Sequence, residues 1–209
     1  MFIHKIKNSP ITSNCYIIYR DNKCIIVDPG SSSNIEILEF LKLNNLSPEY
    51  IFLTHEHFDH IWGLNDLKSI FLDLKVISSI ECSNAIICSK KNMSAFYKNI
   101  NFTCLKSDIV FEDTLDLNWN GIHFHFFVTQ GHSLGSVCIL FNNNLITGDT
   151  IILNEKTVTK FPNSSERELK LSFLKISEKV SFPINIFSGH GEDFTINSKT
   201  EFLNIYNNN

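Results

Sequence analysis

Histidine and carboxylate side chains crowd one short stretch of the chain, residues 55–60, which reads His-Glu-His-Phe-Asp-His. A histidine met singly is usually an ordinary side chain, but three imidazoles directly after an apolar run indicate metal ligands. The apolar run, residues 51–53, reads as a short buried strand. A loop that leaves the end of this strand brings alternate side chains together, so we expect His55 and His57 to share one metal ion and Asp59 and His60 to share a second.

Three further candidate ligands follow short apolar strands elsewhere in the chain. One loop with four ligands cannot complete two tetrahedral sites, so this hypothesis requires more histidine and a carboxylate able to bridge two ions. His132, Asp149 and His190 meet this requirement, and each is flanked by a glycine that allows the backbone to turn sharply. The candidate metal ligands are therefore His55, His57, Asp59, His60, His132, Asp149 and His190.

Five motifs, in one order along nearly the whole chain, carry a family resemblance. They are Asp-Pro-Gly at 28–30, Thr-His-x-His-x-Asp-His at 54–60, Gly-His-Ser-x-Gly-Ser at 131–136, Gly-Asp at 148–149 and Gly-His-Gly at 189–191. This order resembles the metallo-β-lactamase superfamily, in its branch of small glyoxalase II-like (hydroxyacylglutathione hydrolase-like) hydrolases. The tail at 194–196, followed by Glu201, is also similar to that branch.

The resemblance implies a dinuclear, metal-dependent hydrolase. It implies that one metal ion is held by His55, His57 and His132, that the other is held by Asp59, His60 and His190, and that Asp149 bridges them. Two such ions about 3.5–4 Å apart lower the pKa of a shared water from near 16 toward about 7, which supplies hydroxide for attack on a thioester, ester or lactone. Asp59 is expected to orient that hydroxide. Nitrogen and oxygen ligands suit zinc, and iron or manganese is also compatible with them.

Two other functions remain open on the same ligands. One is an iron-dependent oxidoreductase, since the superfamily includes persulfide dioxygenases and flavodiiron proteins; a complete second metal site and a chain too short for a fused flavin domain argue against it. The other is a phosphodiester hydrolase. A non-catalytic binding module would be expected to have lost ligands, and every expected ligand is present.

Composition limits the class of protein. The 209 residues are 43% hydrophobic with a net charge of -4, which predicts one domain over residues 1–209 and no nucleic-acid partner. No apolar run approaches the length of a membrane span, and no long apolar segment follows Met1, so we expect no membrane association. Six scattered cysteines without a Cys-x-x-Cys pair fit reduced thiols in a cytoplasmic protein.

The strands needed to position the ligands form two predicted meanders. The first comprises residues 2–7, 15–19 and 23–27, and the second comprises 110–128 and continues in a hairpin over 137–147. Amphipathic spacing predicts helices after Ser33, over 62–71, over 81–88, after Ser165 and over 198–206. We therefore predict an α+β fold, a four-layer αββα sandwich of two mixed sheets with helices on the outer faces, which the resemblance independently implies.

Two features near the predicted site have competing readings. Asp28 either orients a ligating histidine or caps the turn before Ser31. His123 and His125 alternate with phenylalanines on one strand, and no carboxylate accompanies them in the sequence, so we leave them out of the site.

Substrate contacts are predicted at three positions. Phe96 and Tyr97 lie in a stretch that covers the rim of the site in glyoxalase II-like proteins, although ordinary packing of these aromatics is the simpler reading. Lys160 stands where the family often has an aspartate, which predicts either a solvated lysine or a contact with an anionic small-molecule substrate. The 19 residues after His190 contain Lys199 as their sole cation, so glutathione specificity is not expected.

Overall fold

The computed structural model describes residues 1–208, in two compact units that each contain a β-sheet. The first unit spans residues 1–110 and the second begins at Phe111. Each unit has its own helices and hydrophobic core, so each positions its own share of the predicted ligands. The assignment of residues 1–209 to one domain stays a prediction.

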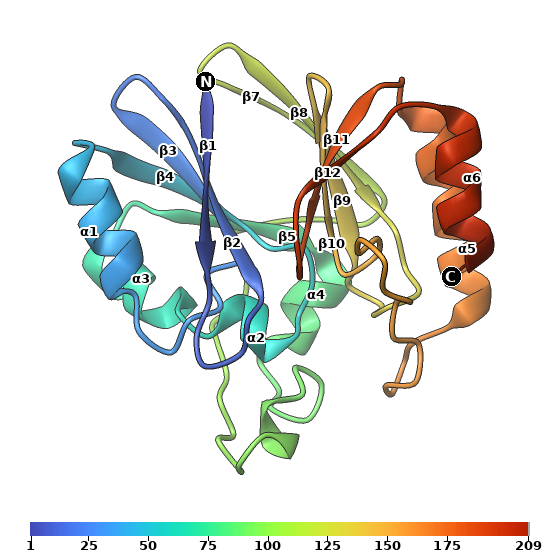
Figure 1. The fold of residues 1–209 in the computed structure, drawn as a ribbon. Coiled ribbons are helices and arrows are strands. Elements are labelled where there is room, and N and C mark those ends of the chain that lie inside the picture. Colours follow the sequence, from blue (N-terminus) through green and yellow to red (C-terminus); the bar gives the residue numbers. More distant parts are fainter. Residues whose placement is uncertain (209) are drawn as a thin grey trace. The chain divides into compact units, whose positions relative to one another are not determined.

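The first unit holds a mixed sheet with the strand order β1-β2-β3-β4-β5-β6 (Figure 1). Its strands are β1 (Phe2–Lys7), β2 (Asn14–Arg20), β3 (Lys23–Val27), β4 (Ser47–Phe52), β5 (Lys75–Ser79) and β6 (Ile109–Phe111). Strands β1, β2 and β3 pair antiparallel, whereas β3, β4 and β5 run parallel. Parallel neighbours end at the same edge of a sheet, so the residues that follow β3 and β4 come together: the Asp28 amide donates to the Phe52 carbonyl at 3.1 Å.

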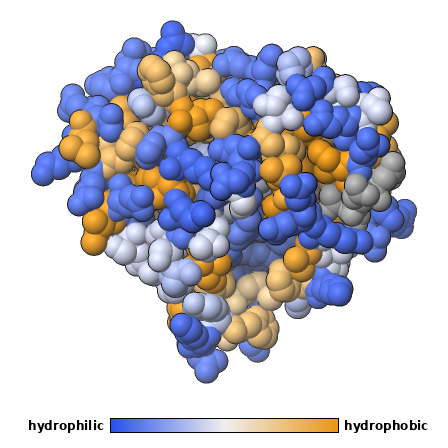
Figure 2. Space-filling view, in the orientation of Figure 1, coloured by the Kyte–Doolittle hydropathy of each residue, from blue (hydrophilic) through white to orange (hydrophobic). Residues whose placement is uncertain are grey.

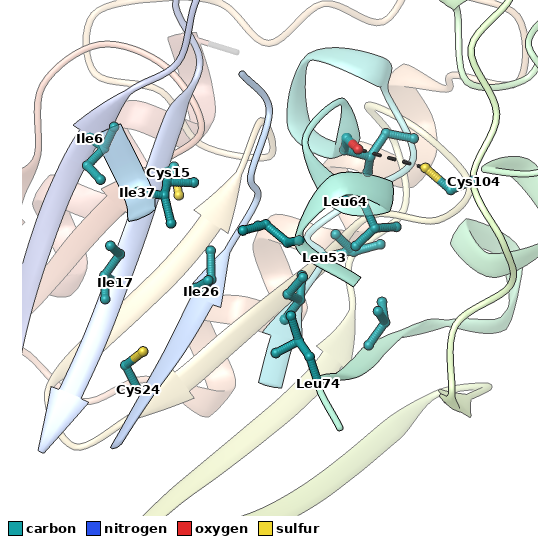
Figure 3. Packing of buried hydrophobic residues seen from close by; sticks show 14 of the residues in the cluster. Ile6, Cys15, Ile17, Cys24, Ile26, Ile37, Leu53, Leu64, Leu74 and Cys104 are labelled. Carbon is teal, nitrogen blue, oxygen red and sulfur yellow. Dashed lines mark hydrogen bonds between the residues drawn. The ribbon is translucent and has the colours of Figure 1, made fainter. Parts of the chain in front are cut away.

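Helices α1 and α3 cover one face of this sheet (Figure 1). The helices of the first unit are α1 (Ile35–Leu43), α2 (Phe58–Ile61), α3 (Leu64–Ile70), α4 (Ile80–Ala85) and the 3-10 turn η1 (Ser94–Phe96). Figure 3 shows Ile37 beside Ile6 and Cys15, and Leu64 beside Leu53, in the core that they share with Ile17 and Ile26. Each such buried aliphatic side chain contributes about 1.5–3 kcal/mol relative to exposure. This core fixes the strand ends from which the ligand loop leaves.

Two helix predictions in this unit need correction. The helix expected over 62–71 begins two residues later, at Leu64, because Gly63 lies in the turn between α2 and α3 and donates its amide to the Pro29 carbonyl at 2.8 Å. A Cβ at Gly63 would lie 2.2 Å from Asn34 Oδ1, so the chain turns where only glycine fits. The cap predicted at Ser33 is one residue out, since α1 begins after Asn34.

The second unit holds another mixed sheet, with the order β12-β11-β10-β9-β8-β7. Its strands are β7 (Thr114–Trp119), β8 (Ile122–Val128), β9 (Val137–Phe141), β10 (Asn144–Gly148), β11 (Ile184–Ser188) and β12 (Phe194–Ile196). Neighbouring strands pair antiparallel except β10 and β11, which are parallel. The short strand β12 was not predicted.

Helices α5 (Glu166–Lys179) and α6 (Lys199–Asn208) lie side by side against the second sheet (Figure 1). The Ser165 hydroxyl caps α5 as predicted, accepting from the Glu168 amide at 3.3 Å. Leu169, Phe173 and Ile176 recur at helical spacing and are buried against β-strand residues of the same cluster. The exposed positions of α5 carry charged side chains together with Leu171 and Leu174.

The surface has a mixed character. Figure 2 shows hydrophilic and hydrophobic side chains interspersed on the face in view, without one continuous apolar area. The longest helix among residues 1–208 has 14 residues, and none of the helices described there is long and apolar enough to cross a membrane.

Candidate metal centre

In the first unit, the Asp28 carboxylate organises the histidine loop. Its Oδ1 accepts from the Thr54 amide at 2.8 Å, and its Oδ2 accepts from the Thr54 hydroxyl at 2.6 Å. His60 Nδ1 lies 2.9 Å from the same Oδ2. Asp28, Thr54 and His60 are all buried, so these bonds are shielded from water. Of the two readings of Asp28, the structure supports the one in which it orients a histidine.

The hydrogen bonds around Asp28 and Thr54 indicate the tautomers of His55 and His60. An ionised Asp28 only accepts, so the proton between it and His60 belongs to His60 Nδ1. Thr54 donates its single hydroxyl hydrogen to Asp28, so at its 3.1 Å contact with His55 Nδ1 the hydroxyl oxygen accepts. Both imidazoles therefore carry their proton on Nδ1 and present the Nε2 lone pair, which is the form that binds a metal ion.

The backbone carbonyl of Asp59 is held in place by residues near the start of the chain. The Ser13 hydroxyl donates to the Asp59 carbonyl. Gly30 also lies against this carbonyl, because a Cβ built there would come within 1.5 Å of the Asp59 oxygen. On the carboxylate side, Asp59 Oδ2 is 3.8 Å from His60 Nε2. Gly30 in the Asp-Pro-Gly motif is thus required for close backbone approach to the ligand loop.

The second unit brings together its three predicted ligands. Asp149 Oδ2 lies 3.5 Å from His132 Nε2 and 3.4 Å from His190 Nε2. Both distances exceed those of an ordinary hydrogen bond. Two donors that each stand about 2.1 Å from one tetrahedral metal ion are roughly 3.4 Å apart, so the spacing fits ligands that share cations. One carboxylate oxygen of Asp149 therefore faces both predicted histidine ligands of this unit.

The parallel pair of β10 and β11 explains how Asp149 and His190 meet. Both residues follow the carboxyl end of their strand, and the Gly189 amide donates to the Gly148 carbonyl at 2.8 Å. Parallel strands end at one edge of a sheet, so ligands that are 41 positions apart in sequence become neighbours.

His132 is held by two backbone contacts. Its Nδ1 donates to the Val158 carbonyl at 3.0 Å, which leaves Nε2 facing Asp149. Gly131, with φ 143°, packs so closely on α5 that a Cβ there would be 2.4 Å from the Leu169 Cα. The Gly131 carbonyl accepts from the Ser165 amide at 2.7 Å. The start of α5 thereby fixes the His132 turn.

The donor set is nitrogen and oxygen. Burial and the Asp28 carboxylate raise the pKa of the Cys15 thiol well above its usual range. Burial, Glu56 and Asp28 do the same for the pKa of Cys82. Both thiols therefore stay neutral, and neutral thiols are poor ligands. Imidazole and carboxylate donors suit zinc, iron or manganese.

The comparison with known families decides the class of the protein. A model described as the metallo-beta-lactamase superfamily matches residues 9–181. The chain belongs to this superfamily. A probable metallo-hydrolase of Bacillus subtilis (strain 168), YqgX, is 30% identical over 203 residues, covering 93% of this chain and 94% of that protein.

The chain is also similar to a curated hydrolase and to a protein of known structure. A hydroxyacylglutathione hydrolase of Citrobacter koseri is 31% identical over 131 residues, which cover 63% of this chain and 43% of that protein. The crystal structure of BLEG-1, described as a B3 metallo-beta-lactamase, aligns with a TM-score of 0.86 at 27% identity, covering 93% of this chain and 94% of that one. The predicted fold class, α+β with two mixed sheets and helices, is confirmed as the metallo-β-lactamase fold.

The predicted substrate contacts differ in their surroundings. Phe96 is 67% exposed, whereas Tyr97 is half-buried and packs on Phe58 at 5.2 Å between ring centroids. The rings of Trp62 and Tyr97 meet edge to face, at 6.2 Å between centroids. Lys160 is exposed, next to Phe161, whose ring stands 6.2 Å from that of His132. The loop that departs from the superfamily pattern therefore contacts a predicted ligand through Val158 and Phe161.

A further expectation from the sequence is wrong. We expected no carboxylate beside His123 and His125, yet Asp116 Oδ1 lies 3.0 Å from His123 Nε2 and 2.8 Å from His125 Nδ1. The hairpin register was the missed signal, since it pairs Asp116 with His125 across the turn at Asn120. The contact between the Val158 carbonyl and His132 was also missed, because any residue type can supply a backbone carbonyl and the sequence therefore does not reveal it.

Proposed function

We propose that the protein is a dinuclear metal-dependent hydrolase that cleaves a thioester or a related ester or lactone. The proposed ligands are His55, His57, Asp59 and His60 from the first unit and His132, Asp149 and His190 from the second. The superfamily match supports a joint role for the two units, because it extends through residues of both.

The observation that carries this proposal is the convergence of His132 Nε2 and His190 Nε2 on Asp149 Oδ2, at 3.5 and 3.4 Å. Two imidazoles that face one carboxylate beyond hydrogen-bond distance suit cations placed between them. The Asp28–His60 contact adds the hydrogen-bonded carboxylate that metal-binding histidines commonly have.

Bound divalent ions would supply Lewis acidity toward a carbonyl group and lower the pKa of a water toward about 7. The protein side chains would do the rest. Asp59, whose side chain is 14% exposed, would accept a hydrogen bond from the attacking water and so orient it. Asp28 and Thr54 would keep His60 and His55 in the Nδ1-protonated form. Val158 would do the same for His132.

The substrate would meet aromatic and cationic side chains at the edge of the site. Tyr97, supported by Phe58 and Trp62, would contact its apolar part, and exposed Phe96 would extend that contact. Lys160 would attract an anionic group. The hydroxyacylglutathione hydrolase match covers 43% of that protein, so we do not extend glutathione specificity to this chain.

Metal analysis together with a substrate panel tests the proposal. Protein purified without chelator should contain close to two transition-metal ions per chain, and Asp149→Ala should lower this number. Glu192→Gln, an exposed acid two positions beyond His190, should leave it unchanged. Hydrolysis should be found among thioesters, esters and lactones, and the rate should fall in acid as ligand histidines protonate.

Three results would contradict the proposal. A single ion per chain at saturating zinc would exclude the dinuclear centre. Hydrolysis confined to phosphodiesters would retain the metal centre and reject the substrate class. A rate that stays flat between about pH 5 and 8 would reject histidine-bound metal, because imidazole ligands titrate in that range.

A further inference from the structure

A second group of histidine and carboxylate side chains lies on one face of β7 and β8, outside the proposed centre. His123 and His125 are two positions apart on β8, so both project from one face of the strand. Asp116 on β7 is paired with His125 and lies diagonal to His123. A single atom, Asp116 Oδ1, is 3.0 Å from His123 Nε2 and 2.8 Å from His125 Nδ1.

Packing accounts for only part of this group: the His125 ring is largely buried and stacks on Phe127, at 5.6 Å between ring centroids. The side chains of His123 and Asp116 are each 57% exposed, and exposed ion pairs contribute little to stability. Nearby hydrophobic contacts are made by the alternate residues of β8, such as Phe124 and Phe126, which are buried on the other face. Packing therefore involves the ring of His125 but does not require an imidazole at position 123.

A hollow of about 410 Å³ adjoins the two histidines. Its walls are His123, His125, Leu140, Phe141, Asn142 and Lys179. Lys179, at the end of α5, stands with its Nζ 3.2 Å from His125 Nε2. There is room here for water molecules, which a surface metal site needs to complete its coordination.

We propose that His123, His125 and Asp116 form an additional binding site for a divalent transition-metal ion of the zinc, nickel or copper class. Two imidazole nitrogens and one carboxylate oxygen are the donors that such ions prefer. The ion would replace the protons that now lie between Asp116 and the two rings. The three donor atoms must come closer together than they now stand, so exposed His123 would turn about its side-chain bonds to bring its nitrogen and that of His125 to one centre.

Lys179 is expected to weaken binding of this ion, because it contacts His125 and carries a positive charge. In the structure His125 donates from Nδ1 to Asp116, so its Nε2 accepts from the Lys179 ammonium. Binding of an ion at Nδ1 moves the ring proton to Nε2, which then cannot accept. The Lys179 ammonium must withdraw, and its positive charge also repels the ion. Loss of this lysine should therefore strengthen metal binding.

Zinc binding to the zinc-saturated protein tests the site. Equilibrium dialysis across micromolar free Zn²⁺, with zinc counted by mass spectrometry, should find one more ion per chain in the wild type than in His123→Ala. Asp116→Asn should weaken binding of that ion by more than about tenfold, since even outer partners of metal ligands contribute 10–100-fold. His123 and Asp116 are exposed, so both variants should fold, which circular dichroism would verify.

Equal zinc content in the wild type and His123→Ala over this range would overturn the proposal. The comparison is independent of the proposed hydrolase centre, because it counts the difference between variants that leave residues 55–60, His132, Asp149 and His190 unchanged. Zinc should also protect His123 from acylation by diethyl pyrocarbonate in the wild type. Absence of protection at saturation would likewise contradict the site.

Two lysines on α5 provide a matched pair. Lys179→Met should tighten zinc binding several-fold, through the lost repulsion and the released His125 nitrogen. Lys175→Met changes the charge equally one turn earlier, where Lys175 Nζ pairs with Asp113 Oδ1 at 2.7 Å. It should leave zinc affinity nearly unchanged. Equal gains in both variants would show a general charge effect and would reject the described geometry.

Discussion

His60 Nδ1 lies 2.9 Å from Asp28 Oδ2, and both side chains are buried. The same oxygen accepts from the Thr54 hydroxyl, which in turn accepts from His55. One carboxylate therefore sets the tautomers of two proposed metal ligands, one directly and one through a threonine. The Asp-Pro-Gly motif and the histidine motif act as one unit because parallel strands β3 and β4 end beside each other.

Asp28→Asn should weaken metal binding more than it weakens the fold. The amide keeps the shape but loses the charge, and its NH2 group cannot accept from His60 or Thr54. We expect a loss of about 10–100-fold in metal affinity, as for other partners that orient ligands. Competition with a chromogenic chelator measures this loss. Asp73→Asn, an exposed acid of the same unit, is the control, and an affinity equal to wild type for Asp28→Asn would refute the orienting role.

Gly131→Ala and Gly191→Ala separate steric clash from backbone strain. Gly131 has φ 143° and no space for a Cβ, whereas Gly191 has φ 73° and its Cβ would meet only Ile152, at 3.9 Å. We expect Gly131→Ala to lower the free energy of unfolding by about 3 kcal/mol or more, from strain plus overpacking. Gly191→Ala should cost about 1–2 kcal/mol.

Urea unfolding, followed by the fluorescence of buried Trp119 in the second unit, measures both glycine variants. The measurement is made with chelator present so that altered metal binding does not contribute. Equal losses in the two variants would contradict the close packing of Gly131 on Leu169.

Cys88 should be the fast-reacting thiol. The backbone amides of Lys91 and Lys90, with the charges of these lysines, lower the pKa of Cys88, which raises its thiolate fraction near neutral pH. Burial raises the pKa of Cys138 to about 12, so that thiol stays protonated and shielded. Iodoacetamide at pH 7 followed by peptide mass spectrometry should modify Cys88 first, and Cys88→Ser should remove the fast phase. Comparable early modification of Cys138 would contradict this assignment.

The sequence predicted which side chains come together where those side chains directly follow the ends of strands. His132, Asp149 and His190 each follow an apolar run, and the structure places the three together in the second unit. What the sequence could not supply were contacts that depend on register or on backbone groups. Asp116 meets His125 only through hairpin pairing, and the Val158 carbonyl that holds His132 has no side-chain signature. The helix break at Gly63 likewise depends on the tertiary neighbour Asn34.

The 157–161 loop offers the test of substrate charge. Val158 and Phe161 both contact His132, with the Val158 carbonyl 3.0 Å from its Nδ1, and exposed Lys160 lies between them in sequence. An exposed ammonium near the site would attract a substrate carboxylate or phosphate by about 1 kcal/mol, and added salt would screen it. Lys160→Ala should raise KM for anionic substrates several-fold and leave kcat for a neutral thioester nearly unchanged.

Lys156→Ala is the matched control, since Lys156 is an exposed lysine four positions earlier in the same connection between β10 and α5. It should alter neither KM nor its salt dependence. If Lys160 is only a solvated side chain, its variant will behave like Lys156→Ala, with a change in stability within about 0.5 kcal/mol. Equal losses on neutral and anionic substrates would point instead to displacement of Val158 from His132. A displaced Val158 carbonyl would also lower metal affinity, whereas loss of a charge that acts only on the substrate would not. Chelator competition on Lys160→Ala therefore distinguishes the two outcomes.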